Sequence, residues 1–170
     1  MSREKTEFAE FFEASWEPCL RAVAASTGSV QLAEDQVAEA FARAWLSWRK
    51  VRRHPAPRAW VVRTALNVGA SWWRRRIREL PLVGHDAEAL GDQALNAEDG
   101  GLDAALLTAL RHLPGRQREV IALRVFLDLD IGTISTQLGI APGTVRAHLS
   151  RGVTALRHEL SLTQAMEADR

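Results

Sequence analysis

Apolar residues recur every three or four positions through most of this chain, and no stretch alternates apolar and polar residues as a β-strand does. This spacing predicts helices that each bury one stripe of side chains. The stripe stops between residues 79 and 101 and resumes afterwards. We therefore expect an all-α protein made of two small helical domains joined by a linker.

The first half of the sequence predicts three helices. One carries an apolar stripe that begins at Phe8, and a second follows the break at Gly28. The third is expected from about Arg58 to Arg78, because Pro55 and Pro57 precede it and proline is tolerated at a helix start but not inside a helix. Residues 5–78 are thus expected to form a three-helix bundle.

Residues 79–101 contain six acids, no Arg or Lys and no sustained apolar stripe, which predicts a flexible acidic linker. Residues 102–162 then predict a four-helix domain. Its third helix is expected at 131–138, with Asp130 as the N-cap and Gly139 just past the end.

The last two predicted helices, 131–138 and 142–160, are short and long and are separated by a turn that contains Gly139. This is the helix-turn-helix pattern, whose second helix can enter the major groove of DNA. The pattern alone leaves open a plain helical hairpin whose arginines only keep the surface soluble.

The net charge of +1 conceals an uneven distribution. Residues 1–78 carry +6, residues 79–101 carry −6 and residues 102–170 carry +1. From Ala40 to Arg78 there are 11 basic residues and no acid, a density that favours a polyanion as partner over a solvated basic surface.

Other classes of protein find little support in the composition. The single cysteine, Cys19, excludes a disulfide framework and a Cys-based zinc site, and the five histidines lack metal-ligand spacing, so no metal or cofactor is expected. No apolar run is long enough to span a membrane, and the N-terminus lacks an apolar signal core, so we expect a cytoplasmic protein. No catalytic set is legible, which speaks against an enzyme.

Motifs in both halves resemble those of the extracytoplasmic-function (ECF) sigma factors, group 4 of the bacterial sigma-70 family. The sequence AEDQVAEAFARAW (33–45) is similar to the family's core-polymerase-binding helix. The sequence PRAWVVRTALN (57–67), followed by WWRRR (72–76), is similar to its promoter-melting helix. The sequences LPGRQREVIALR (113–124) and GIAPGTVRAHLSRG (139–152) resemble its promoter-distal DNA-binding domain. The resemblance covers about residues 5–160 in the family's order.

The resemblance implies an RNA polymerase sigma factor that binds core polymerase at its clamp and flap, directs it to promoter DNA and promotes melting. It assigns residues 5–78 to region 2, which recognises and melts the minus-ten element, and residues 102–162 to region 4, which recognises the minus-35 element. It leaves open whether an anti-sigma factor also binds. The implied core-binding residues are Asp35, Glu39, Phe41, Arg43 and Trp45. From the sequence alone, Phe41 and Trp45 are also expected to lie partly in the core.

The two DNA-binding sets follow from the same resemblance and from the chemistry of melting. Strand separation costs stacking energy, which aromatic faces and cations that bind the single strand can recover. We therefore expect the third helix and residues 51–57 to bind the non-template strand, with Trp73 a better contact than Trp60, which should be buried. The implied minus-ten residues are Arg52, Arg53, His54, Arg63, Asn67, Ser71, Trp73, Arg74, Arg75 and Arg76. The implied minus-35 residues are Pro142, Thr144, Arg146, Ala147, His148 and Arg151.

The sequence also departs from the family pattern. Thr133 stands where an acid is common and Ser135 where alanine is common, which predicts a weaker first helix of the helix-turn-helix. Ser71 replaces a frequent aspartate, and Ala141 replaces a frequent serine cap.

Two other functions remain open at this point. One is a stand-alone transcriptional regulator that uses only the C-terminal helix-turn-helix, with the first half as a sensing or dimerisation bundle. The other is a nucleic-acid-processing enzyme, which would need a metal or an acid-base set.

Overall fold

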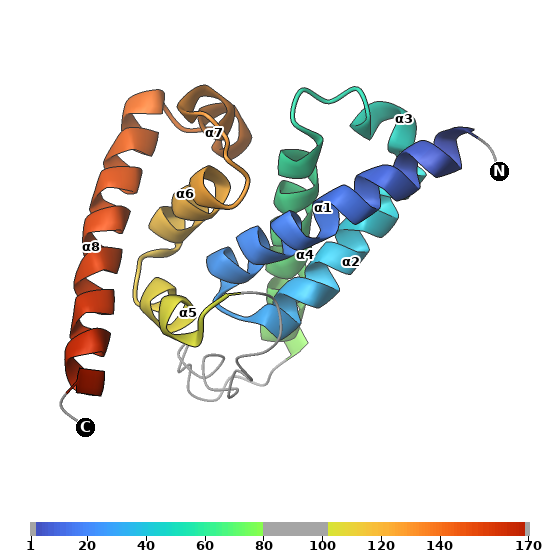
Figure 1. Ribbon diagram of the computed structural model, residues 1–170. Helices are drawn as coiled ribbons and strands as arrows, with labels where there is room; N and C mark the ends of the chain where they lie inside the picture. The colour runs from blue at the N-terminus through green and yellow to red at the C-terminus, as the bar shows by residue number, and fades with distance from the viewer. Residues whose placement is uncertain (1–2, 80–101, 169–170) are drawn as a thin grey trace.

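The computed structural model describes residues 3–79 and 102–168, and within these ranges every regular element is a helix. The all-α prediction is confirmed (Figure 1). The N-terminal group consists of α1 (Arg3–Thr27), α2 (Val30–Leu46), α3 (Trp48–Val51) and α4 (Pro57–Glu79). The C-terminal group consists of α5 (Ala104–Arg111), α6 (Gly115–Val125), α7 (Ile131–Leu138) and α8 (Pro142–Ala168).

The turn between α1 and α2 has a clear local cause. Gly28 adopts a left-handed φ of 76° and donates its amide to the carbonyl of Ala24 at 2.8 Å, which ends α1. The hydroxyl of Ser29 then accepts a hydrogen bond from the amide of Leu32 at 3.3 Å and caps α2. The two helices therefore run back along each other, and both pack on α4.

The expected three-helix bundle contains one further turn of helix, α3. It sits between α2 and the loop that leads to α4, and its residues Trp48 and Val51 are buried. A turn this short has too few residues to show a helical period of its own, so the apolar pattern predicted Trp48 as part of the second helix and no separate α3.

Aromatic rings fill the space between α1 and α2. Phe41 packs edge-on against Phe12, with ring centroids 4.9 Å apart, and also contacts Phe11 and Trp16. Phe8 lies 5.2 Å from Trp48, again edge-on. Such tilted and perpendicular pairs suit the ring quadrupoles, so this cluster fixes α2 against α1.

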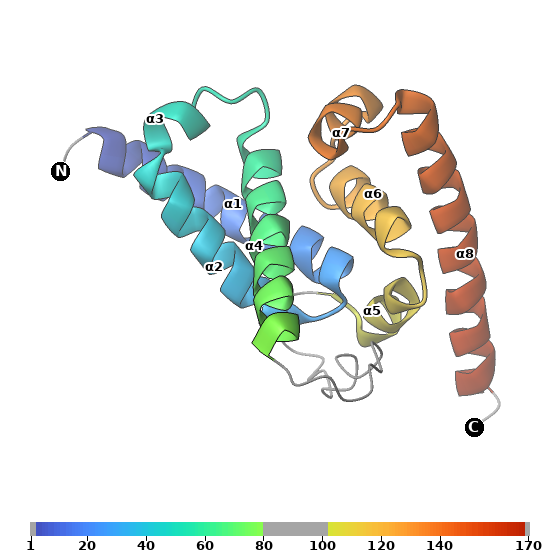
Figure 2. The ribbon, with the colours of Figure 1, turned by 180° about the vertical axis from the view of Figure 1, so that it is seen from behind.

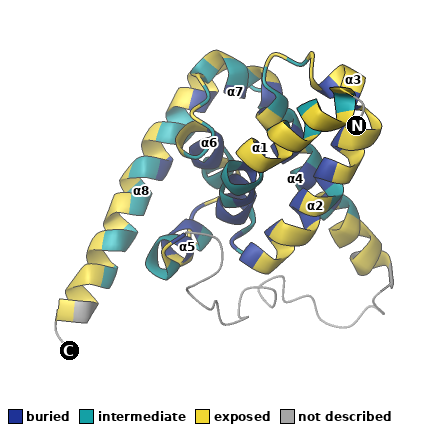
Figure 3. Ribbon diagram, turned by 45° about the vertical axis from the view of Figure 1, so that its right-hand side comes forward, coloured by how far each residue is buried: buried dark blue, intermediate teal, exposed yellow. Residues whose placement is uncertain are grey.

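In the C-terminal group, the four-helix domain and the helix-turn-helix are confirmed. The Asp130 side chain accepts from the amide of Thr133 and caps α7, and Gly139 follows α7 with a left-handed φ of 64°. Helix α8 is longer than expected, because it continues past Leu160 to Ala168. Most of its C-terminal part is exposed or half-buried (Figure 3).

The two groups lie against each other, with α5 and α6 packed on α1 and α7 near α4 (Figures 1 and 2). Buried apolar residues of both groups form one continuous core. The predicted linker, 79–101, falls almost entirely outside the described residues. Within the described ranges, no helix combines the length and the apolar character that a membrane span requires.

Candidate nucleic-acid and polymerase interface

The outer face of α2 carries four of the five predicted core-binding residues. Asp35 is exposed, and Glu39 accepts a hydrogen bond of 2.8 Å from Arg43 one turn later. Trp45 is 40% exposed and rests on the ring of Phe8, with centroids 5.1 Å apart. This face of α2 thus combines charged side chains with the half-exposed ring of Trp45, which packs on Phe8.

Phe41, the fifth predicted residue, is not on this face. It is only 3% exposed and belongs to the aromatic core, so any effect on a partner must act through the position of α2. In contrast, Leu46 is 84% exposed beside Trp45 at the end of α2. Sequence reasoning missed Leu46; an apolar residue off the buried stripe was the available signal.

The loop between α3 and α4 holds the next predicted set. Arg52 donates a hydrogen bond of 2.9 Å to the carboxylate of Glu7, and Arg49 donates one of 3.0 Å to Glu4. The Arg52 guanidinium, together with Arg3, holds the pKa of Glu7 below its usual value. The structure therefore pairs Arg52 with α1.

The other two loop residues differ in exposure. Arg53 is exposed, whereas His54 is half-buried and its Nδ1 accepts the amide of Ala56 at 3.0 Å. His54 with this bond shapes the turn that precedes Pro57 and starts α4.

Helix α4 carries the predicted DNA-binding residues from its first half to near its C-terminal end. Arg63 and Asn67 are exposed in its first half, and Ser71 is half-buried. Trp73 is 42% exposed, and Arg74, Arg75 and Arg76 follow it, all exposed. Trp60 packs against the core but is only half-buried, so the expectation that it is buried is met in part. An exposed ring beside three cations can hold a base and its phosphates.

The first helix of the helix-turn-helix is better anchored than the sequence predicted. Thr133 donates both its amide, at 2.8 Å, and its hydroxyl, at 2.9 Å, to the carboxylate of Asp130. These hydrogen bonds keep the pKa of Asp130 below its usual value, and the bond from the amide has the larger effect. Ser135 donates its hydroxyl to the carbonyl of Ile140 at 2.6 Å. The predicted weakening at these two positions overlooked the local acceptors that each hydroxyl meets.

The N-terminal part of α8 presents the predicted minus-35 residues. Pro142, Thr144, Arg146 and Arg151 are exposed, and Ala147 and His148 are half-buried. Val145 is fully buried, as the stripe requires, and α8 approaches α6 closely at Gly152. Nδ1 of His148 is buried and has no hydrogen-bond partner within the described residues. This face of α8 can enter the major groove of DNA, with Arg146 and Arg151 pointing towards the DNA.

Metal and nucleophile chemistry gain no support from the described residues. Among them, no group of three His, Cys, Asp or Glu side chains lies close enough to hold a metal ion. Cys19 is buried, and burial raises the pKa of its thiol to about 12, which leaves it protonated.

Two family models match the chain, in the order that the motifs predicted. "Sigma-70 region 2" matches residues 15–79, and "Sigma-70, region 4" matches residues 103–156. The ECF RNA polymerase sigma factor SigL of Mycobacterium tuberculosis is 34% identical over 145 residues, which are 81% of each chain. The chain belongs to the ECF RNA polymerase sigma factor family.

Further comparisons agree with this assignment. The RNA polymerase sigma-E factor of Streptomyces coelicolor is 27% identical over 158 residues, covering 92% of this sigma factor and 88% of the relative. The sigma factor RpoE of Bartonella quintana, solved with the anti-sigma factor NepR, shares the fold at a TM-score of 0.71 and 23% identity, over 91% of this chain and 97% of the other.

The sigma factor thus directs core RNA polymerase to promoters and acts in transcription initiation. The region 2 match assigns the first half of the chain to a sigma-factor domain. The alternative of a stand-alone regulator explained that half only as a sensing or dimerisation bundle.

Proposed function

We propose that this sigma factor divides its work among three surfaces. The outer face of α2 binds the polymerase clamp, α4 with the preceding loop binds and melts the minus-ten element, and the start of α8 reads the minus-35 element. The domains that carry them are 5–78 and 102–162. The polymerase carries the chemistry, and this sigma factor supplies recognition in the bacterial cytoplasm without a cofactor of its own.

One observation supports the melting role above all: α4 exposes Trp73 directly before Arg74, Arg75 and Arg76. A base stacked on an aromatic ring gains about 1–3 kcal/mol, which offsets the unstacking cost of one opened step. Consecutive arginines fan around the helix and neutralise phosphates on either side of that base.

The α2 face carries the core-binding proposal. Asp35 and the pair of Glu39 with Arg43 provide charges for a charged partner, and Trp45 and Leu46 provide apolar contact area. Such a mixture of an aromatic anchor and a charged rim is typical of protein interfaces. The Bartonella relative was solved with an anti-sigma factor, so we include an anti-sigma factor among the proposed partners.

Charge reversal on α2 tests the core-binding surface. Asp35→Arg with Glu39→Arg should abolish co-elution with core polymerase while the helical circular dichroism stays unchanged. Glu13→Arg, a charge reversal of the same kind at an exposed position of α1, is the matched control and should leave co-elution intact. Co-elution of the α2 variant at the wild-type level would remove this assignment.

A further inference from the structure

Helix α1 holds both ends of the loop, residues 52–56, that joins α3 to α4. Where the loop begins, Arg49 donates a hydrogen bond of 3.0 Å to Glu4, and Arg52 donates one of 2.9 Å to Glu7. We call these the entry contacts. The side chains of Arg52 and Glu7 are only 33% and 31% exposed, so solvent and salt screen this pair less than a fully exposed one.

Aromatic rings support the entry contacts from below. Phe8 of α1 meets Trp48 of α3 edge-on, with ring centroids 5.2 Å apart, and Phe11 lies at the same centroid distance from Trp48. Trp48 is itself buried. The single turn of α3 therefore cannot shift along α1 without the loss of aromatic and ionic contacts together.

A second set of contacts, which we call the exit contacts, holds the first turn of α4. Nε of Arg58 donates to the hydroxyl of Ser15 at 3.1 Å, and Nη2 of Arg58 donates to the carbonyl of Ala14 at 2.7 Å. Ser15 is buried, so its side chain is out of reach of a ligand in solvent. Glu7 and Ser15 are eight positions apart on α1, so the entry and exit contacts lie roughly 12 Å apart along that helix.

Pro18 explains why the carbonyl of Ala14 is available to Arg58. In a helix this carbonyl accepts the amide hydrogen of the residue four positions later, which here is Pro18, and proline has no amide hydrogen. Arg58 supplies the missing donor from another helix. The proline inside α1 thus creates an acceptor for the exit contacts.

The loop between these contacts has a defined backbone. The amide of His54 donates to the carbonyl of Val51 at 3.0 Å, and Nδ1 of His54 accepts the amide of Ala56 at 3.0 Å. Arg53 and Pro55 are exposed, and the loop lies at one end of the N-terminal group (Figures 1 and 2). The loop therefore presents these two side chains to solvent on a backbone that α1 holds at both ends.

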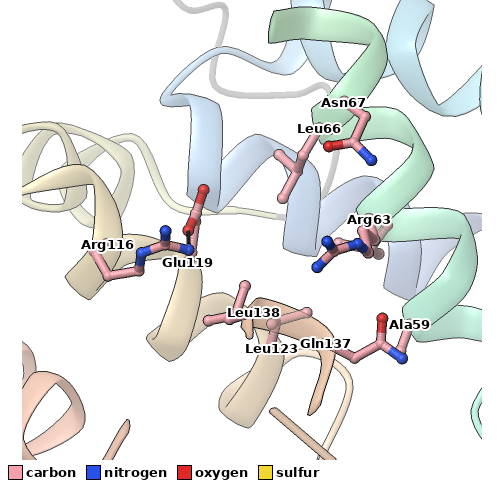
Figure 4. Close-up of a pocket in the computed structure, with 10 residues that line it drawn as sticks. Ala59, Arg63, Leu66, Asn67, Arg116, Glu119, Leu123, Gln137 and Leu138 are labelled. Atoms are coloured by element: carbon pink, nitrogen blue, oxygen red, sulfur yellow. Dashed lines mark hydrogen bonds and ion pairs between the residues drawn. The ribbon is translucent and has the colours of Figure 1, made fainter. Parts of the chain in front are cut away.

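The C-terminal group gives the start of α4 less support than α1 does. A cavity of about 250 Å³ lies between α4 and helices α6 and α7. Ala59 and Arg63 of α4 line it, together with Leu123 of α6 and Leu138 of α7 (Figure 4). Because this side of α4 faces a cavity, the contacts with α1 do most to fix the direction in which α4 leaves the loop.

We propose that the entry and exit contacts position the loop on α1 and thereby set the base preference at the minus-ten element. The inference rests on the proposed function, because it takes α4 with its preceding loop as the minus-ten surface. A loop held at both ends offers Arg53 to the DNA in one position, whereas a loop released at one end adopts several and distinguishes bases less well. Arg52 acts through Glu7 and not as a ligand of the DNA. The positioning residues are Glu7, Arg52, Ser15 and Arg58.

A double-mutant cycle on the full chain, bound to core polymerase, tests the entry contacts. The template is a genomic promoter fragment that the wild type transcribes, randomised over its minus-ten element. Glu7→Ala and Arg52→Ala should each lower the ratio of transcripts with the preferred base to those with other bases by about two- to fivefold. The double variant should be no worse than either single variant, because both remove the same contact. Glu10→Ala is the matched control, since Glu10 is an exposed acid of α1 without an ion pair among the described residues.

The cycle also separates positioning from direct binding. If Arg52 bound the DNA itself, Glu7→Ala would release it and leave the base preference as sharp as in the wild type or sharper, and that result would overturn the proposal. Additive losses in the double variant would overturn it too. A wild type without any base preference would refute the proposed function of the loop, and this inference with it. A preference that the wild type shows and Glu7→Ala retains would refute this inference alone.

Hydrogen exchange provides a readout that needs no DNA. The amides of His54 and Ala56 should exchange several-fold faster in Glu7→Ala than in Glu10→Ala, because the loop opens more often once Arg52 is released. Equal exchange in the two variants would show that the ion pair does not hold the loop, and would overturn the proposal.

Two further variants test the exit contacts at residues away from the DNA. Ser15→Ala removes the acceptor of Arg58 Nε and should lower the base preference by at least about twofold. Pro18→Ala supplies an amide hydrogen that competes with Arg58 for the carbonyl of Ala14. Because alanine favours helix, this variant should unfold at a higher temperature and yet distinguish bases less well. A more stable Pro18→Ala protein with wild-type base preference would count against the exit contacts.

Discussion

The hydroxyl of Ser135 in α7 donates a 2.6 Å hydrogen bond to the carbonyl of Ile140, and the amide of Ile140 donates back to the carbonyl of Ser135 at 3.2 Å. These reciprocal bonds close the turn between the two helices of the helix-turn-helix. The Ser135 side chain therefore helps, with the left-handed Gly139, to set the path of the chain from α7 to α8.

Replacement of Ser135 by alanine should affect promoter binding more than folding. The lost hydrogen bond costs about 0.5–1.5 kcal/mol, and the better helix propensity of alanine returns about 0.5 kcal/mol. We expect a change below about 1 kcal/mol in the free energy of unfolding, but a few-fold weaker binding to minus-35 DNA in a fluorescence anisotropy titration. Ser135→Thr keeps the hydroxyl and should bind as wild type; equal weakening in both variants would show that the hydroxyl is not the cause.

The cap at Asp130 should make α7 sensitive to acid. Because the folded-state pKa of Asp130 is lowered, the carboxylate contributes stability that is fully present above its ordinary pKa of 3.8 and is lost as pH falls through the lowered value. Asp130→Ala should lower the urea midpoint at pH 7, and the gap from wild type should close as the pH falls below about 4.

Asp130→Asn provides the control for this pH dependence. Asparagine can still cap a helix but does not titrate, so its gap from wild type should be small at pH 7 and should not follow the same course in acid. A pH-independent gap between Asp130→Ala and wild type would contradict the role of the ionised carboxylate.

The contact of α8 with α6 at Gly152 leaves no room for a methyl group. A Cβ there would lie 2.7 Å from Cδ1 of Ile121 and 3.3 Å from Cβ of Gln117. Gly152→Ala should therefore destabilise the protein by about 1–3 kcal/mol in urea unfolding, although alanine favours helix.

Removal of the opposing methyl group should reverse part of that cost. Ile121→Val deletes Cδ1 and alone should cost about 0.5–1.5 kcal/mol. The double variant should be more stable than the sum of the two single effects predicts, because the clash is gone. Additive costs would mean that Ile121 is not what excludes a side chain at position 152.

Variants of the arginines of α4 and of α8 should have different effects in a transcription assay. Arg75 is exposed in the melting helix, so Arg75→Ala should impair open-complex formation, and a pre-melted template should partly rescue it. Arg151 is exposed on the first half of α8, so Arg151→Ala should weaken recognition of the upstream element, by about 1–3 kcal/mol if a base contact is lost, and gain nothing from pre-melting. Equal rescue of both variants, or of neither, would refute this division.

Local signals in the sequence predicted most of the helices. Asp130 and Gly139 act locally, as a cap and as a left-handed residue, so the bounds of α7 could be predicted as 131–138. The hydrogen bonds of the Thr133 and Ser135 hydroxyls could not be predicted, because a hydroxyl donates to whichever acceptor the folded turn presents.

The packing of the C-terminal helices against the N-terminal helices also could not be predicted from the apolar pattern of the sequence. The run of small apolar residues at 22–25 indicates that α1 is covered on several sides, but it does not say by which helix. Phe41 shows the same limit within the site: the α2 motif assigned it to the polymerase and its apolar character to the core, and only the structure shows that the aromatic rings of α1 enclose it.

The pairing of Arg49 with Glu4 and of Arg52 with Glu7 bears on how DNA binding responds to salt. An arginine that stays beside its carboxylate presents little net charge to a phosphate, so it displaces few counterions from the nucleic acid. Those two arginines therefore add little to the slope of log affinity against log salt concentration. The basic block of region 2 therefore presents less effective positive charge to DNA than its number of arginines suggests. The carboxylates of α1 determine the size of this reduction.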